Sequence, residues 1–229
     1  MVLRKRLSKD ARRIQLLDAA AKLFCKSSFG QVTTADLAEA AGVTEPVLYQ
    51  HFETKLDLYV ALVKRAREVT FAKYAEVTEK MPTPMLKVLA VIRVHGGVMR
   101  ELDPYFRLHL RALAASDMPR VRQVLRENYL SYVTYFSGLI KQAQDQGEID
   151  KAVDPESISW FIMSQGLLLN LCNQLGLNQL QEQGYIDGLL KDALGHISLV
   201  QDPLGMIAKL FPRQALPDAN PIAEAEPPQ

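Results

Sequence analysis

Apolar residues recur along most of the chain at the three- and four-residue spacing of amphipathic helices, and proline, glycine and capping residues divide this pattern into segments. The chain is therefore predicted to be all-α. Gly96 and Gly97 are expected to interrupt or loosen one helix, because glycine is a poor helix former. The longer helices expected are 55–80, 85–101, 103–115, 119–146, 154–176 and 185–200.

Residues 33–52, TTADLAEAAGVTEPVLYQHF, predict two short helices joined by a glycine-containing turn. Thr33 has the position of an N-cap residue, and Asp36 follows three residues later, as in a capping box. Gly42 can adopt the left-handed conformation that ends a helix, and Thr44 then begins the second helix as its N-cap. This order of signals predicts a helix-turn-helix.

The second short helix has one face suited to the protein core and another suited to a partner. Leu48 and Phe52 lie about one helical turn apart and can pin this helix to the domain. Because an α-helix fits the major groove of DNA, the opposite face is a candidate for reading base pairs. That face presents Glu45, Pro46, Val47, Tyr49, Gln50 and His51.

The stretch from Arg13 to Leu62 resembles the amino-terminal domain of the tetracycline-repressor (TetR) family of bacterial transcription regulators. The resemblance rests on the helix IQLLDAAAKLFCKSSFG, on the helix-turn-helix above, and on ETKLDLYVALV, where Lys55 opens a long helix. The rest of the chain resembles the family only in being helical. The resemblance implies a dimer on a pseudo-palindromic operator. It places Thr34, Thr44, Tyr49, His51 and Lys55 at the DNA backbone, and Glu45, Pro46, Val47 and Gln50 at base edges.

Some of these residues also have a simpler interpretation. Glu45 is a favourable carboxylate at a helix start whatever the partner, whereas against a base it would accept a hydrogen bond from a cytosine amino group. Tyr49 could pack within the domain, and His51 could be an ordinary surface histidine. Glu45, with the lack of a basic residue at Ala35, also leaves open a helical ligand-binding adaptor that has lost DNA binding.

The charge of the chain is unevenly distributed, although the formal net charge is only +1. Residues 1–70 contain 12 Lys and Arg against 8 Asp and Glu, a net charge of +4, so the remaining 15 and 18 give −3. The helix-turn-helix thus lies in the positive part. A basic arm could neutralise phosphates, or it could be a solvated, disordered leader. Its residues are Arg4, Lys5, Arg6, Lys9, Arg12 and Arg13.

We predict three regions: a DNA-binding domain with its basic arm at 1–54, a helical effector-binding and dimerisation domain at 55–211, and a disordered tail at 212–229. The tail is rich in proline, alanine and acidic residues. Helix 154–176 is apolar on nearly all sides, so it must be buried on more than one. We expect the last two helices to form a homodimer interface, with a purely intramolecular core as the alternative.

Aromatic, methionine and histidine residues of the second domain could line a mainly apolar cavity for a small hydrophobic or amphipathic effector. Each of them could equally be an ordinary core residue. The absence of an acidic cluster among them disfavours a cationic effector. The candidate residues are Met99, Phe106, His109, Leu110, Tyr132, Phe136, Met163 and Asn170.

Other classes of function lack their sequence signatures. The chain has no HExxH, GxSxG or glycine-rich phosphate motif, so we expect neither an enzyme nor a cofactor. Cys25 and Cys172 are far apart and do not indicate a disulfide or a metal site. No apolar stretch approaches the roughly 20 residues that cross a bilayer, and the basic start lacks a signal-peptide core. We therefore expect a cytoplasmic protein with no membrane partner.

Overall fold

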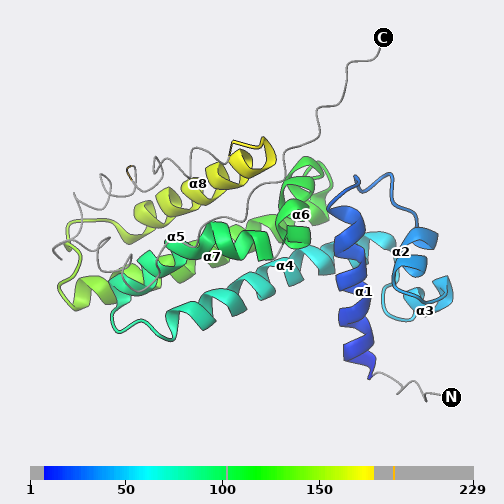
Figure 1. Cartoon of the computed structure of the whole chain (residues 1–229), viewed down its shortest axis with the longest axis horizontal. Coiled ribbons are helices and arrows are strands. Elements are labelled where there is room, and N and C mark those ends of the chain that lie inside the picture. Colours follow the sequence, from blue (N-terminus) through cyan, green and yellow to red (C-terminus); the bar gives the residue numbers. More distant parts are fainter. Residues whose placement is uncertain (1–7, 102, 178–187, 189–229) are drawn as a thin grey trace, which may run out of the picture.

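The computed structural model describes residues 8–101 and 103–177 together with Gly188. Within these residues the chain forms α-helices and no strands, so the predicted all-α class is confirmed (Figure 1). The helices are α1 Lys9–Phe24, α2 Thr34–Ala40, α3 Glu45–Tyr49, α4 Lys55–Thr78, α5 Pro84–Glu101, α6 Asp103–Ala114, α7 Pro119–Asp145 and α8 Pro155–Gln174.

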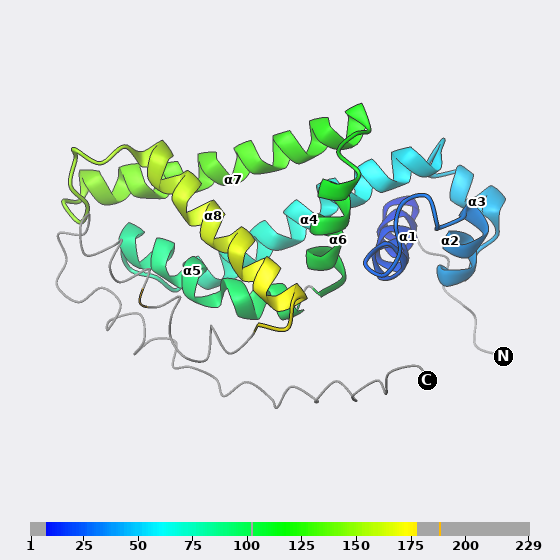
Figure 2. The same ribbon diagram turned by 90° about the horizontal axis from the view of Figure 1, so that it is seen from above.

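The helices fall into two groups that α4 connects. Helices α1, α2 and α3 cluster at one end of the molecule, and α4 runs from this cluster into a bundle with α5, α7 and α8 (Figures 1 and 2). Helix α8 packs against α7 and α5, while α6 packs against both α1 and α4. A movement of α4 or α6 would therefore reach both groups.

Two apolar cores correspond to these groups, and the first of them includes residues beyond residue 54. The first core contains Leu16, Phe24, Leu37 and other buried residues of α1–α4, and it also takes residues from further along the chain. Those later residues are Leu108 and Ala112 of α6 and Val121, Val124 and Leu125 of α7. The DNA-binding domain expected from the sequence thus shares its core with the second group.

The second core lies between α4, α5, α7 and α8. It is built on aliphatic residues of α5 and on Phe136 and Ile140 of α7, with Ile162 from α8. Tyr74 of α4 is 2% exposed and closes this core on the side of the connecting helix. No helix in the described part of the chain is long and apolar enough to span a membrane.

Local signals in the sequence predicted the helix ends closely. Gly42, Gly147 and Gly176 adopt positive φ angles of 64°, 72° and 70°, just beyond α2, α7 and α8, as expected for left-handed residues that end helices. The expected break in α5 is wrong, because the helix continues through Gly96 and Gly97. Apart from Gly188, which is helical, the expected helix 185–200 lies outside the described residues, as does the tail 212–229.

Candidate nucleic-acid interface and internal cavity

Backbone and side-chain hydrogen bonds fix the two helices of the helix-turn-helix. The capping box predicted at Thr33 is present: its Oγ1 accepts from the Asp36 amide at 3.1 Å, and the Asp36 carboxylate accepts from the Thr33 amide at 2.8 Å. Beyond Gly42, the Val43 amide donates to the Ala38 carbonyl at 2.9 Å. Thr44 has the extended backbone of an N-cap, but its side chain makes no capping bond.

Helix α3 separates an inner face from an outer face, as the sequence predicted. Leu48 and Phe52 are 2% and 4% exposed and hold the helix to the first core. On the other side Tyr49 is 47% exposed, which excludes packing of its ring within the domain. Pro46 and Gln50 are exposed beside it, and Glu45 and Val47 are half-buried. The outer face of α3 therefore exposes the aromatic ring of Tyr49 and the amide of Gln50.

Thr34 and Glu45, both expected at DNA, bind each other. The Thr34 hydroxyl donates to the Glu45 carboxylate at 2.5 Å and joins the first turn of α2 to the first turn of α3. Because a phosphate oxygen needs a donor, Thr34 can reach a phosphate only by giving up this bond. The pair thus fixes the angle between the two helices, and its predicted DNA contacts stay predictions.

Lys55 is also engaged inside the protein. Its Nζ donates to the carbonyls of Phe29 at 3.0 Å and Val32 at 2.8 Å, and lies 4.4 Å from the centre of the Phe29 ring. These contacts attach the start of α4 to the loop between α1 and α2. The phosphate contact expected for Lys55 stays a prediction.

Basic residues of α1 surround the end of α3. Arg13 donates from Nη1 to the His51 carbonyl at 2.7 Å, and its guanidinium lies 4.2 Å from the centre of the Phe52 ring. Burial lowers the pKa of His51, and the charges of Lys9, Arg13 and Arg12 lower it further. Positive charge is therefore concentrated beside the end of α3.

The second group of helices contains a partly open cavity of about 100 Å³, lined by residues of α4, α5, α6, α7 and α8. Of the candidate residues, His109, Tyr132, Phe136, Met163 and Asn170 line it, and Leu110 does not. The side chains of Met99 and Phe106 are outside the described part of the structure. Lining residues missed by the sequence analysis include Val63, Arg67, Tyr105, Asn128, Tyr129 and Gln165.

The polar groups of the cavity are mostly uncharged. His109 Nε2 lies 2.8 Å from the Tyr129 hydroxyl, and burial lowers the pKa of His109 to about 4, so its ring is neutral near pH 7. Burial also raises the pKa of Tyr132 to about 12. Arg67 is the one ionised side chain among the described lining residues, and its Nη1 donates to the Ser131 hydroxyl at 3.1 Å.

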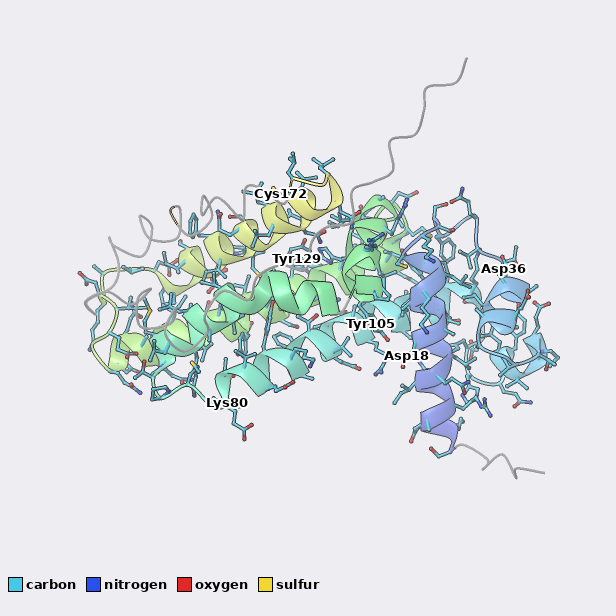
Figure 3. All side chains as sticks on the ribbon, in the orientation of Figure 1. Asp18, Asp36, Lys80, Tyr105, Tyr129 and Cys172 are labelled. Carbon is cyan, nitrogen blue, oxygen red and sulfur yellow. The ribbon has the colours of Figure 1, made fainter. Side chains whose placement is uncertain are left out.

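One lining residue also contacts the DNA-binding end of the molecule. The Tyr105 hydroxyl of α6 donates to the Asp18 carboxylate of α1 and accepts from Arg65 Nε of α4 at 3.1 Å. Arg65 Nε also donates to Asp18 at 3.0 Å. Figure 3 shows Asp18 on α1 and Tyr105 where α6 approaches that helix. We call these three residues the α1–α4–α6 triad.

Comparison with known proteins identifies the amino-terminal part. A family model described as bacterial regulatory proteins, tetR family, matches residues 16–62. The HTH-type transcriptional activator FasR of Mycolicibacterium smegmatis is 47% identical over 60 residues, which make up 26% of this chain and 27% of that protein. The HTH-type transcriptional repressor BepR of Brucella suis biovar 1 is 26% identical over 154 residues, or 65% of this chain and 74% of that protein.

Solved structures share the fold over most of the chain. A TetR-family regulator from Cytophaga hutchinsonii aligns with a TM-score of 0.73 and 20% identity, over 86% of this chain and 100% of that one. The regulator FadR of Bacillus subtilis, in complex with stearoyl-CoA, aligns with a TM-score of 0.64 and 19% identity, over 72% and 88%. The family model and the matching relatives identify residues 16–62 as a DNA-binding region of the tetR family of bacterial regulatory proteins, and the described chain shares the fold of TetR-family transcriptional regulators.

Proposed function

We propose that this protein is a cytoplasmic, homodimeric repressor that binds a pseudo-palindromic operator and is released by a small hydrophobic or amphipathic effector. The observation that carries DNA binding is the outer face of α3, where Tyr49 is 47% exposed while Leu48 and Phe52 anchor the helix. In this proposal Tyr49, His51 and Thr44 contact the DNA backbone, and the cations of α1 lie beside them. Pro46, Val47 and Gln50 then contact base edges.

The exposed apolar surface of α8 supports the dimer. On this helix and just beyond it, large apolar side chains are 37–62% exposed in the single chain, although the helix already packs on α5 and α7. A contiguous surface of this kind marks an interaction site. Two-fold operators also need two α3 helices, one for each half-site about 34–36 Å apart. The exposed residues are Trp160, Phe161, Leu167, Leu168, Leu171, Leu175 and Leu177.

The cavity and the α1–α4–α6 triad support control by an effector. FadR, which shares the fold, was solved with stearoyl-CoA, so a protein of this architecture holds a ligand with a long apolar chain. In our proposal an effector in the cavity displaces Tyr105, weakens its bonds to Asp18 and Arg65, and shifts α4 relative to α1. The two α3 helices of the dimer then no longer match successive major grooves.

Selection from a pool of random duplex oligonucleotides tests DNA binding. We expect enrichment of a pseudo-palindromic sequence, and Tyr49→Ala should weaken binding to it at least about fivefold, the equivalent of roughly 1 kcal/mol. Leu130→Ala is the matched control, because Leu130 is 42% exposed on α7 and away from α3. If no sequence is enriched at any salt concentration, the protein is the helical adaptor instead.

A second pair of variants tests the dimer. Leu171→Asp places a charge on the exposed face of α8, where Leu171 is 47% exposed, and should give monomers in analytical ultracentrifugation with loss of operator affinity. Leu130→Asp makes the same change on α7 and should leave the dimer intact. BepR is named a repressor and FasR an activator, so a reporter gene behind the selected operator tests the sign of regulation.

A further inference from the structure

Three side-chain amide oxygens at the cavity have no hydrogen-bond partner. They are Asn128 Oδ1, Gln165 Oε1 and Asn170 Oδ1, and all three residues line the cavity. Asn128 and Asn170 are only 4% and 2% exposed, so bulk water does not compensate them. An unsatisfied buried polar group is costly, and a ligand that pairs with it recovers that cost on binding.

We propose that the cavity takes an uncharged amphiphile whose polar end donates at least two hydrogen bonds, from hydroxyl or amide groups, to these amide oxygens of α7 and α8. This assignment rests on the effector-controlled regulator proposed above and adds the chemical class of its effector.

The hydrogen bond made by the Asn128 amide nitrogen shows that its oxygen is the atom available to a ligand. Asn128 Nδ2 donates to the backbone carbonyl of Val63 at 3.0 Å, which assigns the nitrogen and leaves the oxygen as the unpaired atom. Asn170 projects from a helix with mostly apolar neighbours, and Gln165 reaches only the Ser164 hydroxyl, at 3.4 Å through its Nε2. The oxygens of these two amides are therefore available to a donor on the ligand.

An ionic head group does not match the amide oxygens at this end, although Arg67 would attract an anion elsewhere in the cavity. A carboxylate has no hydrogen to donate, and its oxygens would repel the amide oxygens. A quaternary ammonium would meet Arg67 without a compensating carboxylate, because the described lining residues include no Asp or Glu. The remaining walls are largely aliphatic and aromatic, with Val91, Leu108, Phe136 and Ile162 among them, which suits an apolar body.

The cavity is large enough to hold a ligand and not only single water molecules. A cavity needs a volume of roughly 10–15 Å³ to hold one water molecule. The observed volume of about 100 Å³ therefore leaves room for several connected atoms, and larger ligands can enter as side chains shift. Water alone is the competing occupant, and in that case the cavity would show no preference among ligands of equal length.

A matched series of compounds with one apolar chain tests the class. The probes are 1,2-octanediol, 1-octanol, octyl methyl ether, octanoate and octyltrimethylammonium, titrated into the full chain by calorimetry. We expect the diol to bind tightest, and each donor that is removed to weaken binding about fivefold to tenfold. The two ions should bind more weakly than the diol. An ether that binds as tightly as the diol, an ion that binds tightest, or no binding by any probe would overturn the assignment.

Variants connect the preference to the amides. Asn170→Leu should weaken diol binding about fivefold to tenfold and leave ether binding unchanged, since it removes the acceptor that the diol uses and that the ether, which has no hydrogen to donate, does not. Gln165→Met serves the same purpose if Asn170→Leu does not fold. Thr134→Ala is the control, because it removes an exposed hydroxyl of α7 that lies outside the cavity lining. An unchanged diol preference in both amide variants would contradict the proposal.

Operator binding is measured separately, so the two proposals can fail separately. Binding to a selected operator without donor preference in the cavity refutes the effector class and leaves the regulator. Donor preference without any operator refutes the DNA-binding proposal and leaves the chemistry of the cavity.

Discussion

The α1–α4–α6 triad gives the sharpest prediction about how the cavity communicates with DNA. Tyr105→Phe keeps the ring that lines the cavity and removes only the hydroxyl that bridges Asp18 and Arg65. If the hydroxyl holds α1 in its DNA-binding position, the variant should resemble the effector-bound protein even when no effector is present.

The magnitude follows from the partners of the hydroxyl. A hydrogen bond to a charged group contributes about 1.5–3 kcal/mol. The Asp18 side chain is 47% exposed, so solvent screening reduces this contribution, and the direct Asp18–Arg65 pair survives in the variant. We therefore expect a loss of about 1 kcal/mol, which corresponds to roughly fivefold weaker operator binding without effector. The effector should then lose about the same factor from its influence on operator affinity.

Fluorescence anisotropy with a labelled operator measures both quantities, and a double-mutant cycle of Asp18→Asn with Tyr105→Phe measures their coupling. Adjacent partners should show a coupling energy of about 0.5–1.5 kcal/mol in unfolding. Tyr135→Phe is the control, because that hydroxyl lies in the second group of helices and is outside both the cavity lining and the triad. An unchanged operator affinity with a coupling energy near zero would refute the role of the triad.

Three further predictions concern pH, structure and salt. Burial lowers the pKa of His109 to about 4, below the unfolded value of 6.5, so its contribution to stability is complete above pH 6.5 and is lost as pH falls toward 4. When the pH is lowered from 7 to 5, the free energy of unfolding measured in urea should therefore fall by about 2 kcal/mol less in His109→Gln than in the parent protein. Lys55→Met should destabilise the protein by about 2 kcal/mol, because it removes a cation bound to two carbonyls and a ring. An unchanged melting temperature together with weaker operator binding would instead place Lys55 at a phosphate. Replacing Arg4, Lys5 and Arg6 by Ala should lower the salt slope of operator binding by about 0.9 for each phosphate that the arm no longer neutralises, and an unchanged slope would exclude a phosphate-binding arm.

The parts of the fold that depend on near neighbours were predicted from the sequence. The Thr33 capping box, the left-handed Gly42 and the inward side chains of Leu48 and Phe52 each follow from residues within about one or two helical turns. The same reasoning overestimated the effect of Gly96 and Gly97. Each glycine costs about 1 kcal/mol in a helix, and packing of the preceding turns of α5 in the second core offsets this cost.

The contacts that define the candidate sites join distant parts of the chain, so no local pattern predicts them. The Thr34–Glu45 bond depends on the angle between α2 and α3. The triad joins residues that are 47 and 40 positions apart. Helical periodicity also fails to separate a cavity wall from a packed core, which is why Tyr129 was missed although Tyr132 was found.

The cavity and the core around α1, α2 and α3 share a wall, which would let the proposed effector act on both. Val63, Leu108 and Ala112 line the cavity and also belong to the core that holds α1, α2 and α3. Moving a two-state equilibrium from 99:1 to 1:99 takes about 5.5 kcal/mol of differential binding, whereas the triad supplies only about 1 kcal/mol. Because protein cores are close-packed, a ligand that displaces these three side chains must repack the DNA-binding core as well. Most of the coupling energy should therefore come from this shared apolar wall. The triad should add a smaller contribution that favours the DNA-binding position of α1.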